Sequence, residues 1–182
     1  LFPEHASFVS DCLERHKRGQ LPHALLLTSD SGLGLRCVAE SIARGLLLAT
    51  SLVSDRETED RIMAGTHGDY QWLRVQDGKV SIGVDQVRSA CDFVGKTAGY
   101  GTSKVLVIEE ADRLTVAAAN ALLKTLEEPQ GLTFILLTSR CPWLLPATVR
   151  SRCQSKKLPA LSLETCRSYL DQTSSPAEES AV

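Results

Sequence analysis

Residues 28–36, TSDSGLGLR, have the outline of a phosphate-binding loop. Such a loop reads G-x-x-x-x-G-K-[ST]. Its backbone N–H groups surround the phosphates, its lysine reaches the β- and γ-phosphates, and its hydroxyl group binds Mg²⁺. Gly34 stands at the second glycine position of this pattern, and Gly32 adds conformational freedom. The chain therefore retains the shape of a nucleotide site at this point.

The residues that perform the chemistry of the loop are missing. Ser29 stands at the first glycine position, Leu35 at the lysine and Arg36 at the hydroxyl position. We expect Leu35 to bring an apolar group toward the phosphates and Arg36 to leave the loop in a different direction from the usual lysine. An active ATPase in which Arg36 replaces the lysine is the disfavoured alternative, and a nucleotide held without turnover remains open.

Acidic residues follow an apolar run further along the chain. VLVIEEADRL, residues 105–114, has the form of a Walker B strand, in which the first acid orients Mg²⁺ and the second polarises the attacking water. Glu109 and Glu110 occupy those places, and Thr138, after another apolar run, stands where a polar sensor of the γ-phosphate would lie. The alternative for the two acids is a solvated strand end.

Short apolar runs between turn residues predict the strands that would position these groups. They cover residues 23–29, 69–75, 104–111 and 132–139, with a weaker fifth candidate at 154–161. Because the runs are nearly continuous rather than alternating, they favour a parallel sheet covered on both faces.

Helical spacing separates the runs. The apolar positions that recur at intervals of three and four are Leu35, Val38, Ile42 and Leu46, then Val84, Val87, Cys91 and Val94. A third helix has Thr115 as its N-cap, an apolar face of Val116, Leu122, Leu123 and Leu126, and an end marked by Pro129 and Gly131. Residues 50–68 are polar and predict an exposed helix or loop. The alternation of strands and helices predicts an α/β fold.

The bulk composition is that of an ordinary globular chain. It has 182 residues, 43% of them hydrophobic, and a net charge of -2, which excludes a global attraction to nucleic acid. No apolar run approaches the roughly 18 residues of a spanning helix, so we expect one main domain in the cytoplasm.

Cysteine and histidine are dispersed along the chain. The six cysteines include no C-x-x-C pair, which predicts free thiols and neither a disulfide nor a zinc site. The four histidines are expected at the surface or at helix ends.

Taken in order, the motifs resemble one family. AANALLKTLEEP at 118–129 and ATVRSRCQ at 147–154 resemble the clamp-loader branch of the AAA+ proteins. AGTHGDYQWL and IGVDQVR are similar to motifs of the delta-prime subunits of the bacterial DNA polymerase III clamp loader. The resemblance implies a three-layer P-loop AAA+ core with a five-stranded parallel sheet and helices on both faces over residues 1–160. Residues 161–182 would then begin the helical lid, followed by a tail with the composition of disorder.

The resemblance also implies a function. Delta-prime subunits commonly carry damaged loops and do not hydrolyse ATP, yet they retain the arginine of S-R-C, which is Arg152 here. That residue is similar to an arginine finger supplied in trans to a neighbouring ATPase subunit. The implied partners are gamma- or tau-type ATPase subunits, the delta subunit, indirectly the sliding clamp, and primed DNA, with no membrane and no cofactor beyond passive ATP or ADP.

Alternatives stay open for Arg152 and its neighbour. Arg152 could instead pair with an acid of its own domain, near Glu109 or Glu110. Arg150 could assist the finger or form a surface salt bridge. An α/β interaction domain unrelated to replication is the remaining alternative for the whole chain.

Two features limit the comparison with the family. Many members carry a four-cysteine zinc module, whereas residues 49–65 here contain no cysteine. We therefore expect zinc to be absent. We also expect the segment SDRETEDR to keep the same outline through helix propensity and charge pairs. The basic residues Arg88, Lys96, Lys104 and Lys124 either face primed DNA in a loader or are solvated surface charges.

Overall fold

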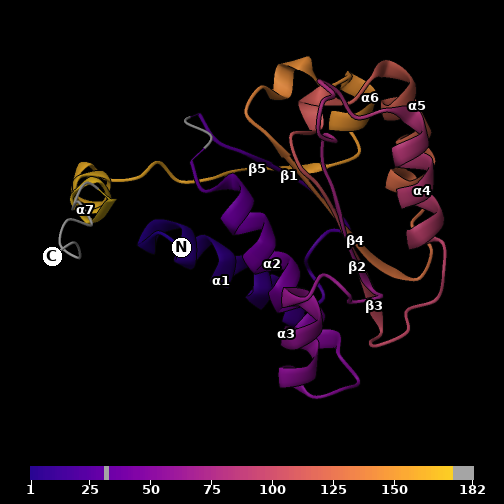
Figure 1. Ribbon diagram of the computed structural model, residues 1–182, viewed down its shortest axis with the longest axis horizontal. Helices are drawn as coiled ribbons and strands as arrows, with labels where there is room; N and C mark the ends of the chain where they lie inside the picture. The colour runs from indigo at the N-terminus through magenta and orange to yellow at the C-terminus, as the bar shows by residue number, and fades with distance from the viewer. Residues whose placement is uncertain (31–32, 174–182) are drawn as a thin grey trace, which may run out of the picture.

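The computed structural model describes residues 1–30 and 33–173, in which a parallel sheet lies between two layers of helices (Figure 1). The strands, in the spatial order β2-β3-β4-β1-β5, are β1 (Ala24–Thr28), β2 (Tyr70–Leu73), β3 (Ser103–Ile108), β4 (Leu132–Ser139) and β5 (Gln154–Lys157). The helices are α1 (Pro3–Lys17), α2 (Leu35–Thr50), α3 (Asp55–Met63), α4 (Val84–Val94), α5 (Val116–Glu127), α6 (Ala147–Arg150) and α7 (Leu163–Thr173), with short 3-10 turns η1 (Ala111–Arg113) and η2 (Pro142–Leu144).

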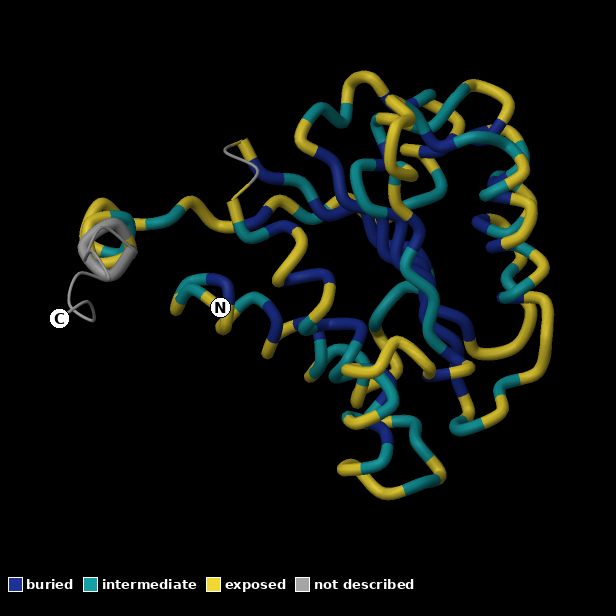
Figure 2. The backbone as a smooth tube through the Cα atoms, viewed as in Figure 1, coloured by how far each residue is buried: buried dark blue, intermediate teal, exposed yellow. Residues whose placement is uncertain are grey.

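Successive residues of the central strands supply two separate cores. Val105 and Val107 of β3 pack with α1 and α2, whereas Leu106 and Ile108 pack with α4 and α5. Because side chains alternate across a strand, a sheet buried on both faces favours apolar residues at successive positions. Figure 2 shows the central strands β1, β3 and β4 buried along most of their length, between helices whose outer faces are exposed.

The predicted strands are confirmed, with shorter ends. β3 stops at Ile108 rather than continuing to residue 111, because Glu110 adopts a left-handed backbone conformation with φ of 49° that a strand cannot contain. The weak fifth candidate at 154–161 is a strand only over Gln154–Lys157. Helix α1 was not predicted, since the residues it buries are His5, Val9 and Cys12, a weak apolar signal.

The predicted helices are also confirmed, with one error. Thr115 caps α5 by accepting a hydrogen bond from the N–H of Ala118 at 3.2 Å. Val116, assigned to the apolar face, is 72% exposed because it is the first residue of the helix, and Ala118 and Ala119 are buried there instead.

The polar segment before β2 is a helix. In α3, Ser54 caps the first turn and Arg61 pairs with Glu57 at 2.7 Å, while Arg44 of α2 pairs with Glu59 at 2.7 Å. The expected helix and charge pairs are therefore present in this segment. In the described residues no group of His, Cys, Asp or Glu side chains is placed to share a metal ion, and no helix is long and apolar enough to cross a membrane.

Candidate functional site

The loop between β1 and α2 closes against the first helix. Gly34 has a φ of 76°, and a Cβ atom on it would lie 2.4 Å from the ring of His5. Only glycine fits both the conformation and the contact. His5 lies in the first turn of α1, as a helix-end histidine was expected to, but it is buried rather than at the surface, and its Nε2 lies 3.3 Å from the carbonyl of Pro159. Ser29 is buried at the end of β1, and Gly32 lies outside the described residues.

Leu35 and Arg36 take different directions from this loop. Leu35 is 5% exposed and belongs to the core beneath α2, so the expectation that it reaches toward the phosphates was wrong. Leu35 is the first residue of the amphipathic helix α2, and its side chain lies on the buried apolar face of that helix. Arg36 lies 5.7 Å over the ring of Trp72 and 4.0 Å from Glu109. Leu35 is therefore not available to bind a phosphate, and Arg36, 60% exposed, extends toward Trp72 and Glu109 instead.

The first acid after β3 already has partners. Glu109 accepts a hydrogen bond from the indole N–H of Trp72 at 2.8 Å, and its side chain is 19% exposed. The sequence offered no signal for Trp72, because the contact joins the ends of two neighbouring strands. Trp72, Arg36 and Glu109 form one cluster across the β2–β3 edge, where a Mg²⁺ ligand would otherwise be expected.

The second acid is held by two arginines. Glu110 lies 3.0 Å from Arg113 and 3.2 Å from Arg140, and its backbone N–H donates to the hydroxyl of Thr138 at 3.1 Å. Thr138 is buried and acts here as a structural acceptor. The structure thus brings Glu109, Glu110 and Thr138 together at the carboxyl edge of the sheet, but with their polar atoms engaged by the protein. These residues do not fit a Mg²⁺–ATP site.

A cavity of about 810 Å³ lies beside Gly34, between the N-terminus and α7. Phe2 and Tyr169 meet across it edge to face, with ring centroids 5.3 Å apart. Glu4 connects α1 to α7. Its carboxylate accepts hydrogen bonds from the N–H of Ser162 at 3.1 Å and from the hydroxyl of Thr165 at 2.8 Å. These contacts connect the core to α7.

This connection is expected to weaken in acid. Hydrogen bonds from the backbone N–H of Glu4 itself, then from the N–H of Ser162 and the hydroxyl of Thr165, lower the pKa of Glu4 from 4.5 to about 2. Because the pKa is lower in the folded state, the ionised carboxylate stabilises the contact fully above pH 4.5. This stabilisation is lost as the pH falls toward 2 and Glu4 is protonated. An NMR titration of the Thr165 amide and the Tyr169 ring should show the transition, and Glu4→Gln should remove it. The same transition in both proteins would contradict the assignment.

Arg152 lies at the opposite edge of the sheet from the loop. It comes just before β5, whose first residue pairs with Leu25 near the start of β1, whereas the loop follows the end of β1. The five residues of β1 separate the two edges by roughly 16 Å. Arg152 therefore cannot serve the loop of its own chain.

The guanidinium of Arg152 is held on the surface between α5 and α6. Its Nε donates to Glu127 at 2.6 Å, its Nη2 donates to the same carboxylate, and its Nη1 donates to the carbonyl of Thr148 at 2.8 Å. The side chain is 31% exposed and that of Glu127 is 48% exposed. The alternative that Arg152 pairs with an acid of its own domain is confirmed, but the acid is Glu127. A partner near Glu109 or Glu110 was wrong, because both of those acids follow the carboxyl end of β3. Arg150 is exposed at the end of α6.

The stretch AGTHGDYQ has a structural role. Asp69 is 1% exposed, and its carboxylate accepts the backbone N–H groups of Gly99, Tyr100 and Gly101 at 2.7, 2.7 and 3.0 Å. His67, also buried, accepts the N–H of Asp69 at Nδ1, and burial lowers its pKa. These contacts fix the loop that leads into β3.

Comparison with known proteins identifies the family. The family model described as "DNA polymerase III, delta subunit" matches residues 5–162. The chain belongs to this family. It is 40% identical to the DNA polymerase III subunit delta' of Pseudomonas aeruginosa over 171 residues, which cover 89% of this chain and 52% of that protein. It thus spans about half the length of this relative.

The chain is also similar to a tau subunit in sequence and to a solved gamma-subunit-related protein in fold. The DNA polymerase III subunit tau of Salmonella typhimurium is 32% identical over 84% of this chain and 24% of that protein. A solved gamma-subunit-related protein of Thermotoga maritima superimposes with a TM-score of 0.66 at 24% identity, over 88% of this chain and 50% of that one. The expected fold, a three-layer AAA+ core with a five-stranded parallel sheet, is confirmed.

Proposed function

We propose that this chain is the core of a non-catalytic clamp-loader subunit of DNA polymerase III, a stator that supplies Arg152 to the ATP site of a neighbouring ATPase subunit. The observation that carries the proposal is the separation of the two sites. The loop of the chain lacks a phosphate-binding lysine, while a partly exposed arginine lies at the other edge of the sheet, where only another molecule's phosphate can reach it.

The geometry of Arg152 supports this role. Its Nη1 donates to the carbonyl of Thr148, which orients the guanidinium and can remain in place when a phosphate replaces Glu127. The pair with Glu127 is solvated, and such pairs contribute about 0–1 kcal/mol. A γ-phosphate could therefore displace Glu127 at small cost and form the stronger bidentate contact.

The partners follow from the same proposal. The neighbouring subunit would be of the gamma or tau type, and the delta subunit, the sliding clamp and primed DNA would be engaged through the assembled loader. Residues 1–160 would form the AAA+ core and α7 the first helix of the lid. The lid angle would be set by the Glu4 contacts rather than by a nucleotide.

A nucleotide held without turnover is the second candidate function. The cavity beside Gly34 favours it, because the aromatic side chains of Phe2 and Tyr169 are part of its lining. The lack of a lysine at Leu35 argues against tight binding of the phosphates.

The purified chain is expected to release phosphate from Mg²⁺–ATP no faster than buffer does, because Glu109 and Glu110 are engaged by Trp72, Arg113 and Arg140. A phosphate-release assay with the chain and its Glu110→Gln variant tests this. Turnover above background that disappears in the variant would overturn the non-catalytic assignment. Calorimetry with ATP distinguishes passive binding from none.

A further inference from the structure

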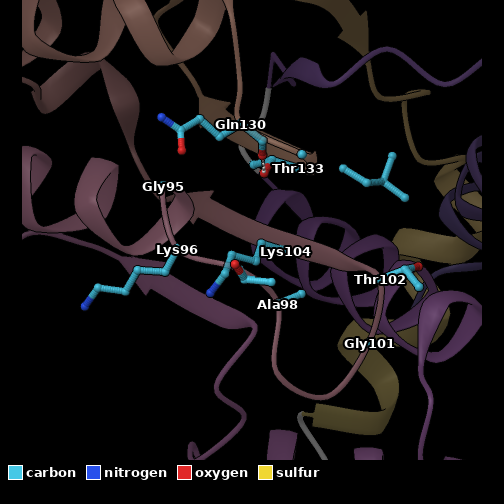
Figure 3. Close-up of a pocket in the computed structure, with 11 residues that line it drawn as sticks. Gly95, Lys96, Ala98, Gly101, Thr102, Lys104, Gln130 and Thr133 are labelled. Atoms are coloured by element: carbon cyan, nitrogen blue, oxygen red, sulfur yellow. Dashed lines mark hydrogen bonds between the residues drawn. The ribbon is translucent and has the colours of Figure 1, made fainter.

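A second cavity, of about 310 Å³, lies at the amino edge of the sheet, away from the degenerate loop. It is enclosed by the loop that follows α4, the start of β3 and the turn before β4. Its lining includes Lys96, Thr97, Lys104, Gln130 and Thr133. Figure 3 shows the side chains of Lys96, Lys104 and Gln130 extending to the same side of these segments in that view.

Lys104 is the unusual member of this lining. Its side chain is 6% exposed, and its ammonium lies 4.2 Å from the centroid of the Phe93 ring and 3.7 Å from a carboxylate oxygen of Asp69. The alternative of a solvated surface charge is therefore wrong for Lys104. At 3.7 Å the ammonium and the carboxylate are too far apart for a hydrogen bond.

Asp69 compensates Lys104 only in part. Its carboxylate oxygens already accept three backbone N–H groups, and Asp69 does not line the cavity. Among the described residues that line the cavity there are two lysines and no carboxylate. A buried ammonium has three donors and is stabilised by an anion that can accept from it.

We propose that this cavity binds a phosphate group, with the ammonium groups of Lys104 and Lys96 as its cationic partners and the amide of Gln130 and the hydroxyl of Thr97 as polar ones. Because the cavity is open to solvent, the phosphate could belong to either of two ligands. One is a free phosphate compound such as pyrophosphate, and the other is the phosphodiester of a nucleic acid. The proposal is independent of Arg152 and of the proposed function.

The test is an NMR titration of the ¹⁵N-labelled chain with inorganic pyrophosphate and, separately, with a short single-stranded oligonucleotide. Saturable shifts of the Lys96, Thr97 and Gly131 amides are expected with at least one of them. Lys96→Gln should weaken binding about ten-fold, as the loss of one charge-assisted contact does, whereas Lys79→Gln, an exposed lysine outside the cavity, should have no effect.

Lys104→Met is the second variant, and it should abolish the shifts if it folds. Because it could also disturb Asp69, its fold is checked by the amide spectrum, and Lys96→Gln tests the site without that risk. Preference for pyrophosphate would assign a small-molecule site and preference for the oligonucleotide a nucleic-acid contact. The absence of saturable shifts with both ligands, or equal weakening by Lys96→Gln and Lys79→Gln, would overturn the proposal.

Discussion

Arg152→Ala in the full-length subunit is expected to lower ATP hydrolysis at the neighbouring site by about 10³ or more, which is the usual contribution of an arginine finger. Only the one site that this subunit abuts should be affected, so total turnover by the reconstituted loader would fall several-fold. Folding should be nearly unchanged, because Arg152 is partly exposed and its pair with Glu127 is solvated. Melting temperature and clamp-stimulated ATPase, measured on the same preparation, test both statements.

Two variants sharpen this test. Arg152→Lys should fail to restore turnover, since an ammonium lacks the planar fork. Glu127→Gln is the matched control, because it removes the acid that orients Arg152 and leaves the guanidinium in place. Turnover near that of the unaltered subunit is expected for it. If Arg152 instead has a structural role, both Arg152→Ala and Glu127→Gln will melt early while the remaining assemblies hydrolyse ATP normally.

Asp69→Ala is expected to cause the largest loss of stability among single substitutions proposed for this chain, about 3–5 kcal/mol in the free energy of unfolding. The substitution removes the acceptor of the Gly99, Tyr100 and Gly101 N–H groups, two of which belong to half-buried residues, and it removes the countercharge of Lys104. For a domain of this size the melting temperature should fall by roughly 10 °C. Thermal and urea unfolding followed by circular dichroism measure the effect.

Asp85→Asn is the control for this substitution. Asp85 is 93% exposed and lies 3.4 Å from Arg88, so its loss should change stability by less than about 0.5 kcal/mol. Asp69→Asn should lie between the two, because an amide oxygen still accepts hydrogen bonds but carries no charge. Equal stabilities of the Asp69→Ala and Asp85→Asn proteins would show that the Asp69 contacts contribute little.

The sequence by itself determined the layers of this protein and the defect in its loop. Short continuous apolar runs such as residues 105–108, rich in β-branched residues, favour strands with two buried faces, and the period of α2 and α5 follows from their own residues. The sequence also shows directly that Leu35 stands where a phosphate-binding loop has its lysine. Local spacing was sufficient for these features because each is formed by residues within one element.

Only the tertiary structure decided which polar groups meet. Arg152 and Glu127 are 25 residues apart, Trp72 and Glu109 are 37 apart, and Asp69 contacts residues 30 to 32 positions further on. Such contacts depend on strand order and register, which periodicity does not specify. The burial of Lys104 has the same origin, since β3 runs between β2 and β4 and its second residue is covered by segments from elsewhere in the chain.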